Sequence, residues 1–530
     1  MERQKVMDGK TSQHHILLLL FIFLASLYMI TTPGYFTTSM GMSVYSTAKS
    51  FIEEGDFALD KPTLETGLGK DGKYYVYEGL AFILIVTAFF GIIKFLAPHG
   101  FLLIANQMIT ATACLLIYFV GRELKYSKRT SILLSLIYGV ATMAWVHSRY
   151  LMPEPLTTFV YLTSFLFLLK YKNRKETKWL FLCGCFSGLA LIVRPEAPLF
   201  IFAIGIGILM SFYRDYRERN KGVGSIVLEG FIFLAPVVLF LAIYAYNNYA
   251  RFGDIFELGY ATKGHGLLES DYGNKGHPIR DLNDTLLGFL GMWVIPCRSM
   301  FYINPVLIFI FWALKDFWKK YKHEFIVIGI AFVFHVLLYS NRGPLGFPGS
   351  SAWGIRYMVP MTSFMVIVMG IFVEKISKQR SRLSKVFLAV AVLSVLFQSI
   401  GASQSYQVTQ GFLEEQSRIE QGKWNARKMM NLDPRWSLLI QNLKWLRRGL
   451  VDHMYYNYLF NRRLMHDSFL TGGGPPSWLG FVLFVYVCAL TVSGYLLYRI
   501  LRLPEAEPAK KKRRGKQRKR QKHMNSKIRH

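Results

Sequence analysis

Long runs of apolar residues alternate with short polar stretches along most of the chain. A helix of about 20 apolar residues crosses the hydrocarbon core of a bilayer, and fewer suffice where protein surrounds the helix. The pattern therefore predicts an all-α polytopic membrane protein with about twelve transmembrane helices. The runs expected to cross are 16–32, 101–120, 131–150, 155–169, 179–193, 197–213, 225–246, 301–314, 325–340, 357–373, 386–402 and 478–499.

A thirteenth apolar run, 79–97, decides which loops share one side of the membrane. If it does not cross, five basic loops and the basic C-terminal tail lie on the same side as the N-terminus. Short loops that each carry four or five Lys and Arg residues belong in the cytoplasm. We therefore expect both termini in the cytoplasm and 79–97 as a re-entrant or interfacial helix. The five loops are 121–130, 170–178, 212–222, 315–323 and 374–385.

This parity places the longer polar segments on the extracytoplasmic side, where we expect the chemistry. These segments are 33–100, 247–300, 341–356 and 403–477. The start of the first, from Thr32 to Asp60, has a helical apolar face that is expected to lie along the membrane surface. Its residues are Phe36, Met40, Val44, Ala48, Phe51 and Ile52. The expected organisation is a transmembrane catalytic module (1–402), an extracytoplasmic amphipathic segment (403–477), a last transmembrane helix (478–500) and a disordered basic cytoplasmic tail (501–530).

Composition sharpens this interpretation. The chain has 530 residues, 52% of them hydrophobic, and a formal net charge of +30. The charge is concentrated in the short loops and in the tail, where residues 510–530 contain twelve Lys and Arg. Anionic membrane lipids account for such a tail better than a nucleic acid does. The five cysteines lack the spacing of metal ligands, so no metal site is assigned. No cofactor is firmly implied, and a divalent metal stays an open alternative without a clear site.

Candidate residues gather at the outer ends of the predicted spans. In "HSRYLMPEPL", Arg149 ends one span and Glu154, between two prolines, starts the next. In "LIVRPEAPL", Arg194 and Glu196 repeat this arrangement. The prolines break the helix and fix the carboxylate on a short turn. For Arg194 and Glu196 the alternatives are an arginine that snorkels to headgroups and a structural ion pair.

Two further stretches add basic and aromatic residues. "GLGKDGKYYVYEGLA" carries Asp71, Lys73, Tyr74 and Glu78 after a Gly-rich start, and Asp71 is either a functional acid or only a turn residue. "SSAWGIRYMVP" carries Trp353 and Arg356 at the start of a span. Motifs for ATP, dinucleotides, serine hydrolysis and zinc proteolysis are absent from the sequence. Arginines and acids at such positions suit an amphiphile with an anionic head, because arginine holds phosphate at two points and a carboxylate accepts a proton.

The order of these features resembles the GT-C superfamily of integral-membrane glycosyltransferases, particularly protein O-mannosyltransferases and the lipid A aminoarabinose transferase. The resemblance covers roughly residues 15–375 and depends on "GKDGKYY", "GLALIVRPE", "NPVL" and "WGIRY". It implies a sugar donor on a polyprenyl or dolichyl phosphate, transferred on the extracytoplasmic face of the plasma or inner membrane. The acceptor would be a lipid, a glycan or a protein.

The resemblance also implies an Asp early in the first external loop, about five residues before a Tyr. Here "SMGMSVY" has Tyr45 in place and Met40 where the Asp is expected. Three explanations stay open: another acid takes its role, for which Glu154, Asp71 and Glu53 are the candidates, or the alignment with the family shifts here, or the protein is catalytically weak.

In the leading hypothesis Arg149, Arg356 and Lys73 hold the donor phosphate, and Glu154 or Asp71 activates the acceptor. Tyr74, Arg194, Glu196 and Trp353 complete the substrate site. The alternatives are a transporter or flippase of lipid-linked sugars, although the two halves of the chain show no repeat, and a non-catalytic membrane scaffold.

The predicted topology can be tested with reporter fusions. A reporter after Lys175 or Lys319 is expected in the cytoplasm, and one after Gly264 outside, because the basic loops share one side. If the Gly264 fusion is cytoplasmic and the Lys175 fusion is external, run 79–97 crosses the membrane and the candidate residues lie on the wrong face.

Overall fold

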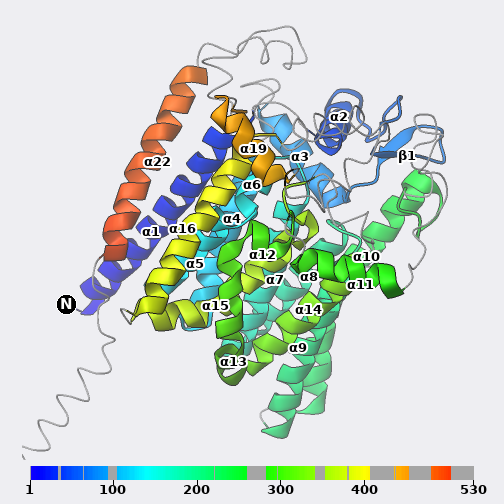
Figure 1. Ribbon diagram of the computed structural model, residues 1–530. Helices are drawn as coiled ribbons and strands as arrows, with labels where there is room; N and C mark the ends of the chain where they lie inside the picture. Colours follow the sequence, from blue (N-terminus) through cyan, green and yellow to red (C-terminus); the bar gives the residue numbers. More distant parts are fainter. Residues whose placement is uncertain are drawn as a thin grey trace, which may run out of the picture.

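The computed structural model is a bundle of helices with a small layer over one end (Figure 1). It describes residues 2–33, 38–63, 65–93, 104–219, 221–259, 282–294, 297–340, 352–378, 381–405, 435, 437–449, 451–452 and 479–502. The bundle comprises α1 (Glu2–Thr31), α4 (Ile104–Glu123), α5 (Lys128–Ala141), α6 (Ala144–Ser148), α7 (Glu154–Arg174), α8 (Thr177–Leu191), α9 (Ala197–Arg217), α10 (Val223–Phe252), α12 (Met300–Ile303), η2 (Pro305–Phe309), α13 (Ile310–Lys320), α14 (Lys322–Ser340), η3 (Arg356–Met358), α15 (Val359–Ser377), α16 (Arg382–Ala402) and α22 (Leu479–Arg502).

Every apolar run that was expected to cross coincides with one or more of these helices. Eight helices in the described part of the chain are long and apolar enough to span a membrane, and α8 is a shorter apolar helix. The all-α polytopic class is therefore confirmed, while the number of twelve crossings stays a prediction.

Two of the predicted spans are broken rather than continuous. The run 131–150 is divided into α5 and α6 at Thr142, whose backbone is extended, and the run 301–314 is divided at Asn304. Pro305 cannot donate a backbone hydrogen bond, which explains the second break. The two breaks meet, because the Met143 N–H donates to Asn304 Oδ1 at 2.7 Å. Hydropathy alone cannot reveal a break whose freed backbone groups are satisfied by a distant side chain.

Burial separates central from peripheral helices. In α15, 83% of the apolar stretch is buried, against 11% in α16 and 17% in both α10 and α22. The last helix, α22, packs against the first, α1, at the edge of the bundle (Figure 1). In a membrane the exposed apolar faces of these outer helices would contact lipid chains.

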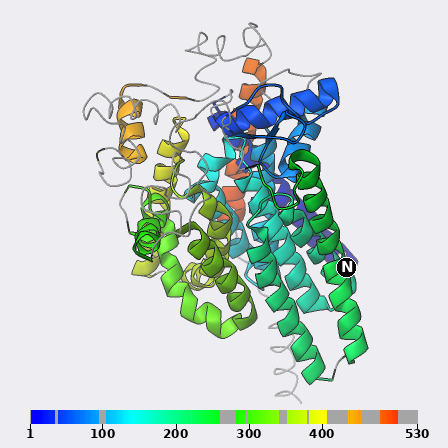
Figure 2. The same ribbon diagram turned by 90° about the vertical axis from the view of Figure 1, so that its right-hand side faces the viewer.

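The layer over the bundle is built from α2 (Ser39–Glu54), a hairpin of β1 (Thr66–Leu68) and β2 (Tyr74–Val76), and α3 (Leu80–Ile93). Helix α2 lies across the end of the bundle (Figure 2). Two further helices, α11 (Leu282–Trp293) and α19 (Leu438–Arg447), complete the described elements.

The apolar face of α2 does not lie along the membrane surface as the sequence suggested. Met40, Val44 and Ala48 are buried in the protein core, and Tyr45 packs edge-to-face on Phe90 of α3 with ring centroids 5.4 Å apart. Helix α3 covers the apolar face of α2. The spacing of apolar residues in the sequence shows that this face is buried, but it cannot show whether protein or lipid covers it. Phe51 is partly exposed, and Phe36 lies outside the described residues.

The five basic loops meet on one face of the bundle. Arg174 pairs with Glu123 at 2.7 Å, Lys175 with Asp215 at 2.6 Å, and Lys172 with Glu324. The Ser127 N–H donates to Glu374 at 3.0 Å, and Lys375 pairs with Asp316 at 3.6 Å. These contacts join the five loops that the distribution of Lys and Arg predicted to lie on one side of the membrane.

Both ends of the segment around α3 lie on the opposite face. The Ala81 N–H donates to the carbonyl of Ile192 at 2.9 Å, just after α8 ends. Near the start of α4, the Asn106 side chain donates to the carbonyls of Tyr150 and Met152 at 2.5 and 2.7 Å. This arrangement agrees with a segment that enters and leaves on the same side.

Arg149 joins three distant parts of that face. Its fully buried guanidinium donates to three backbone carbonyls. Nε donates to that of Thr31, Nη1 to that of Gln404 at 2.9 Å and Nη2 to that of Asp452 at 2.8 Å. The ends of α1 and α16 and the segment after α19 are therefore held together by one side chain. With three of its donors used in this way, Arg149 acts here as a structural cross-link.

We expect Arg149→Met to lower the free energy of unfolding by at least about 3 kcal/mol, because it leaves three buried carbonyls without a donor. Thermal or denaturant unfolding in detergent measures the change. Lys73→Met is the matched control: its exposed ion pair with Asp56 predicts little effect. Unchanged stability of Arg149→Met would contradict the cross-link and return Arg149 to the candidate phosphate ligands.

Candidate active site

Proline-punctuated turns place two acids at the N-terminal ends of helices. Glu154 is the first residue of α7, between Pro153 at the N-cap and Pro155. Glu196 is the N-cap of α9 and follows Pro195. Both side chains are almost completely buried. Two sequence motifs far apart in the chain thus supply carboxylates to one site.

Arg194 lies at the centre of this site. Its Nη2 is 2.9 Å from Glu154 Oε1, its Nε is 3.3 Å from Glu196 Oε1, and its Nη1 is 4.0 Å from Glu78 Oε2. Arg356 approaches the same Glu154 oxygen through Nε at 3.4 Å. We call these five residues the ionic cluster. The four residues Glu154, Arg194, Glu196 and Arg356 were selected from the sequence, and the fold brings them together.

Two tyrosines fix the arginines. Tyr339 of α14 and Tyr357 of η3 stack with ring centroids 4.7 Å apart and planes 3° apart. The Arg194 and Arg356 guanidiniums lie 5.2 and 4.7 Å from the Tyr357 centroid, and Tyr339 donates its hydroxyl to Glu196 at 2.6 Å. Cation–π contacts of this kind strengthen away from water.

The cluster has one carboxylate more than it has guanidiniums. Burial raises the pKa of Glu78 to about 7, with Arg194 opposing the shift and Glu154 adding to it. For Glu196 burial acts in the same upward direction, but Arg194, His335 and the Tyr339 hydrogen bond outweigh it and lower the pKa. Glu78 is therefore the member of the cluster that can exchange a proton near neutral pH.

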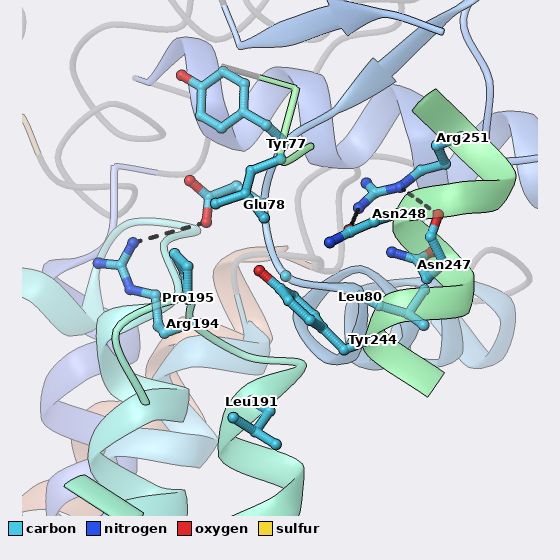
Figure 3. A pocket seen from close by; sticks show the side chains of 12 residues that line it. Tyr77, Glu78, Leu80, Leu191, Arg194, Pro195, Tyr244, Asn247, Asn248 and Arg251 are labelled. Atoms are coloured by element: carbon cyan, nitrogen blue, oxygen red, sulfur yellow. Dashed lines mark hydrogen bonds and ion pairs between the residues drawn. The ribbon is translucent and has the colours of Figure 1, made fainter. Parts of the chain in front are cut away.

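Glu78 and Arg194 form one wall of a small cavity (Figure 3). The opposite wall is the C-terminal end of α10, with Tyr244, Asn247 and Arg251 among its lining residues. The cavity is thus enclosed by the turn before α3, the turn between α8 and α9, and the last turns of α10.

Arg251 is held in the wall by uncharged groups. It donates to the carbonyl of Val76 at 2.8 Å, to Asn248 Oδ1 at 3.3 Å and to the carbonyl of Asn247 at 3.4 Å. Within the part of the chain that the structure describes, no carboxylate lies at ion-pair distance from Arg251. The acid on the opposite wall, Glu78, lies 4.0 Å from Arg194 instead, so the positive charge of Arg251 suits an anionic ligand.

Arg251 was not among the residues selected from the sequence, and Glu78 was noted in its stretch but given no role. Arg251 is in the last turn of α10, beyond the predicted end of that span, and nothing in its local sequence links it to the hairpin before α3. Glu78 lies in the "KDGKYYVYEGLA" stretch, where only burial distinguishes it from Asp71.

Four of the other predicted residues lie on the exposed layer, away from the ionic cluster. Lys73 pairs with Asp56 at 2.8 Å, and Asp71 accepts from the Tyr75 hydroxyl at 2.6 Å. Tyr74 forms part of β2, and Glu53 is an exposed residue of α2 at 3.7 Å from Lys49. The Gly-rich turn closes the hairpin instead of directing these side chains inward.

Arg149 and Trp353 are likewise outside the cluster, but for the opposite reason: both are completely buried. Trp353 Nε1 donates to Gln398 at 3.1 Å, and its carbonyl is 2.9 Å from His147 Nε2. Met40, where the resemblance implies an Asp, is an apolar core residue near the start of α2. The described residues contain no group of three or more His, Cys, Asp or Glu arranged to hold a metal ion.

Comparison with known proteins agrees with this picture. Residues 79–240 match the family model of dolichyl-phosphate-mannose-protein mannosyltransferases. The match begins one residue after Glu78, includes the turns that carry Glu154 and Arg194, and ends within α10, before Arg251. It confirms the resemblance to protein O-mannosyltransferases over these residues. No curated protein sequence matches the chain significantly.

Solved structures with a similar chain arrangement are distant. The Archaeoglobus fulgidus oligosaccharyltransferase in the apo form has 12% identity and a TM-score of 0.46, and the match covers 86% of this chain and 58% of that one. ArnT from Cupriavidus metallidurans bound to undecaprenyl phosphate has 12% identity and a TM-score of 0.43, with 90% and 88% covered. The same ArnT in the apo state has 12% identity and a TM-score of 0.45, with 93% and 89% covered.

Proposed function

We propose that this protein is a glycosyltransferase that moves a sugar from a polyprenyl or dolichyl phosphate to an acceptor on the extracytoplasmic face of the membrane. One observation carries the proposal. A single cavity has an acid of raised pKa on one wall and an arginine without a carboxylate partner on the other. Transfer from a lipid phosphate needs both, because a proton leaves the acceptor while negative charge grows on the departing phosphate.

Arg251 is the proposed ligand of the donor phosphate. A guanidinium binds phosphate through two charge-assisted hydrogen bonds, and the interaction strengthens as the bond between the sugar and the phosphate breaks. The sequence favoured Arg149, Lys73 and Arg356 for this role. Arg149 is engaged with three carbonyls and Lys73 with Asp56, so Arg251 replaces them, and Arg356 remains in the ionic cluster.

Glu78 is the proposed general base. In its ionised form it accepts the proton of the acceptor while the acceptor oxygen or nitrogen attacks the anomeric carbon of the sugar. A pKa of about 7 suits this task, since an efficient base has a pKa near the working pH. Glu154, which the sequence favoured, contacts both Arg194 and Arg356 and is proposed to position them.

The family match supports a lipid-phosphate donor, because the family is described by dolichyl-phosphate mannose. The basic loops on the opposite face of the bundle support an extracytoplasmic cavity and cytoplasmic termini. A non-catalytic scaffold is the competing function, favoured by the apolar Met40 in the position of the implied Asp. Cell-free transfer from a panel of labelled prenyl-phosphate sugars separates the two, since a scaffold transfers none of them.

Glu78→Gln is expected to lower kcat by about 10²–10⁴-fold with little change in the donor KM, because the carboxamide keeps the shape but cannot accept a proton. For the unmodified protein, kcat/KM is expected to rise as the pH rises through about 7, where Glu78 becomes ionised. Initial rates with a labelled donor between about pH 5.5 and 8.5 measure both effects.

The matched control is Glu53→Gln, which removes an exposed acid from α2 and is expected to leave kcat and the pH profile unchanged. Full turnover by Glu78→Gln, or a flat profile across neutral pH in the unmodified protein, would exclude Glu78 as the base. Glu154 would then be the next acid to test.

Arg251→Gln is expected to weaken the apparent donor affinity by roughly ten- to a hundredfold, which corresponds to a charge-assisted hydrogen bond of about 1.5–3 kcal/mol. Arg251→Lys keeps the charge without the two-point geometry, so its apparent donor affinity should lie between those of the unmodified protein and Arg251→Gln. Donor titrations at saturating acceptor measure the effect, and the melting temperature reports whether the contact with Val76 is needed for folding. Lys319→Gln, on the basic face, is the control. A folded Arg251→Gln with an unchanged donor KM would refute the assignment.

A further inference from the structure

Three cations surround one tryptophan at the basic end of the bundle. Trp179 is near the start of α8, and its ring centroid is 4.4 Å from Lys170 Nζ, 5.1 Å from Lys178 Nζ and 5.3 Å from Arg174 Cζ. Like charges repel, so three of them around one ring need a reason beyond the ring itself. This group, which we call the Trp179 cation site, lies far along α7 from Glu154 and plays no part in the proposed transfer.

The acids nearby do not balance these charges. Arg174 pairs with Glu123 at 2.7 Å and Lys178 pairs with Glu176. Lys170 is half-buried, and among the described residues no carboxylate lies at ion-pair distance from it. Three cations and two carboxylates leave a net charge of +1 on the lipid-facing side of the α7–α8 hairpin.

The neighbouring lysines do not share this surplus, because they point into the bundle. Lys172 pairs with the buried Glu324, and Lys175 with the buried Asp215 at 2.6 Å. The chain thus satisfies the basic residues on the inner side of the hairpin with its own acids and leaves the outer side positively charged.

A row of aromatic rings leads from Trp179 along the hairpin toward the middle of the membrane. Phe167 stacks on Trp179 with centroids 5.7 Å apart and planes 24° apart, and Phe186 lies 5.6 Å from Phe167 and 6.2 Å from Phe159. All four rings are half-buried, so each keeps an exposed edge. Phe159 and Phe167 are eight residues apart on α7, which is about 12 Å along the helix.

We propose that the Trp179 cation site binds one anionic phospholipid of the cytoplasmic leaflet. The phosphodiester lies between Lys170 and Lys178 above the Trp179 ring, and one acyl chain runs along Phe167 and Phe186. Tryptophan and basic residues at the end of a span sit at headgroup depth, and basic pockets on that side attract anionic lipids. The charge excludes a zwitterionic lipid as the preferred ligand, and the aromatic row excludes a free phosphate.

The test uses the full chain, delipidated in detergent, with added phosphatidylglycerol or phosphatidylcholine and native mass spectrometry to count bound lipids. The unmodified protein is expected to bind its first phosphatidylglycerol at least tenfold more tightly than phosphatidylcholine. Lys170→Gln/Lys178→Gln is expected to lose that preference. Lys315→Gln/Lys319→Gln removes two lysines from the same face but away from Trp179, and should retain it.

Equal affinity for phosphatidylglycerol in the two double variants, or no headgroup preference in the unmodified protein, would overturn the proposal. Soluble glycerophosphoglycerol at the same concentration should not compete, and competition would refute the acyl-chain contact. If the double variant has a lowered melting temperature without lipid, Lys170→Gln alone decides the matter, because that lysine has no ion pair to lose. The basic tail is present in every variant and cannot account for a difference between them.

Discussion

One buried positive charge organises the end of the bundle opposite the basic loops. The Arg194 guanidinium contacts Glu78, Glu154 and Glu196, which come from the turn before α3 and from the first residues of α7 and α9. A charge removed from water needs a partner, and breaking a buried pair costs about 3–5 kcal/mol. The three segments must therefore converge on Arg194. That convergence also builds one wall of the cavity, so the interaction that stabilises the fold positions the proposed base.

At the opposite end of the bundle, ion pairs between basic and acidic side chains also join the helices. Between helices in lipid there is little hydrophobic driving force, because acyl chains are as apolar as leucine side chains. Neighbours must then be chosen by close packing and polar pairs. The pairs Lys175–Asp215, Lys172–Glu324 and Arg174–Glu123 do this between α7 and three other elements. The surplus of cations left on the outer hairpin surface is available for the membrane itself.

Much of the site could be predicted because the local sequence shows whether a residue lies in the middle or at the end of an apolar run. Glu154, Arg194, Glu196 and Arg356 each lie at the end of an apolar run, and helices of similar length bring such ends to one level. Asp71 and Lys73 were equally plausible from sequence, but their turn closes an exposed hairpin. Arg149 and Trp353 share the right level but point into the protein, where carbonyls and a glutamine satisfy them. The direction of a side chain depends on its neighbours in space, which a single sequence does not specify.

The sequence by itself determined that the chain is a polytopic helical membrane protein, that five basic loops share one face, and that acids and arginines collect on the other. These properties follow from the lengths of the apolar runs, their hydropathy and the positions of the charged residues, all of which can be read from the sequence one residue at a time. Only the tertiary structure decided that Glu78 and Arg251 face each other across a cavity, that α3 covers the apolar face of α2, and that two spans break where Asn304 meets Met143. Each depends on contacts between segments far apart in the chain, and the free energy of a buried charge or a freed backbone group is set by those contacts.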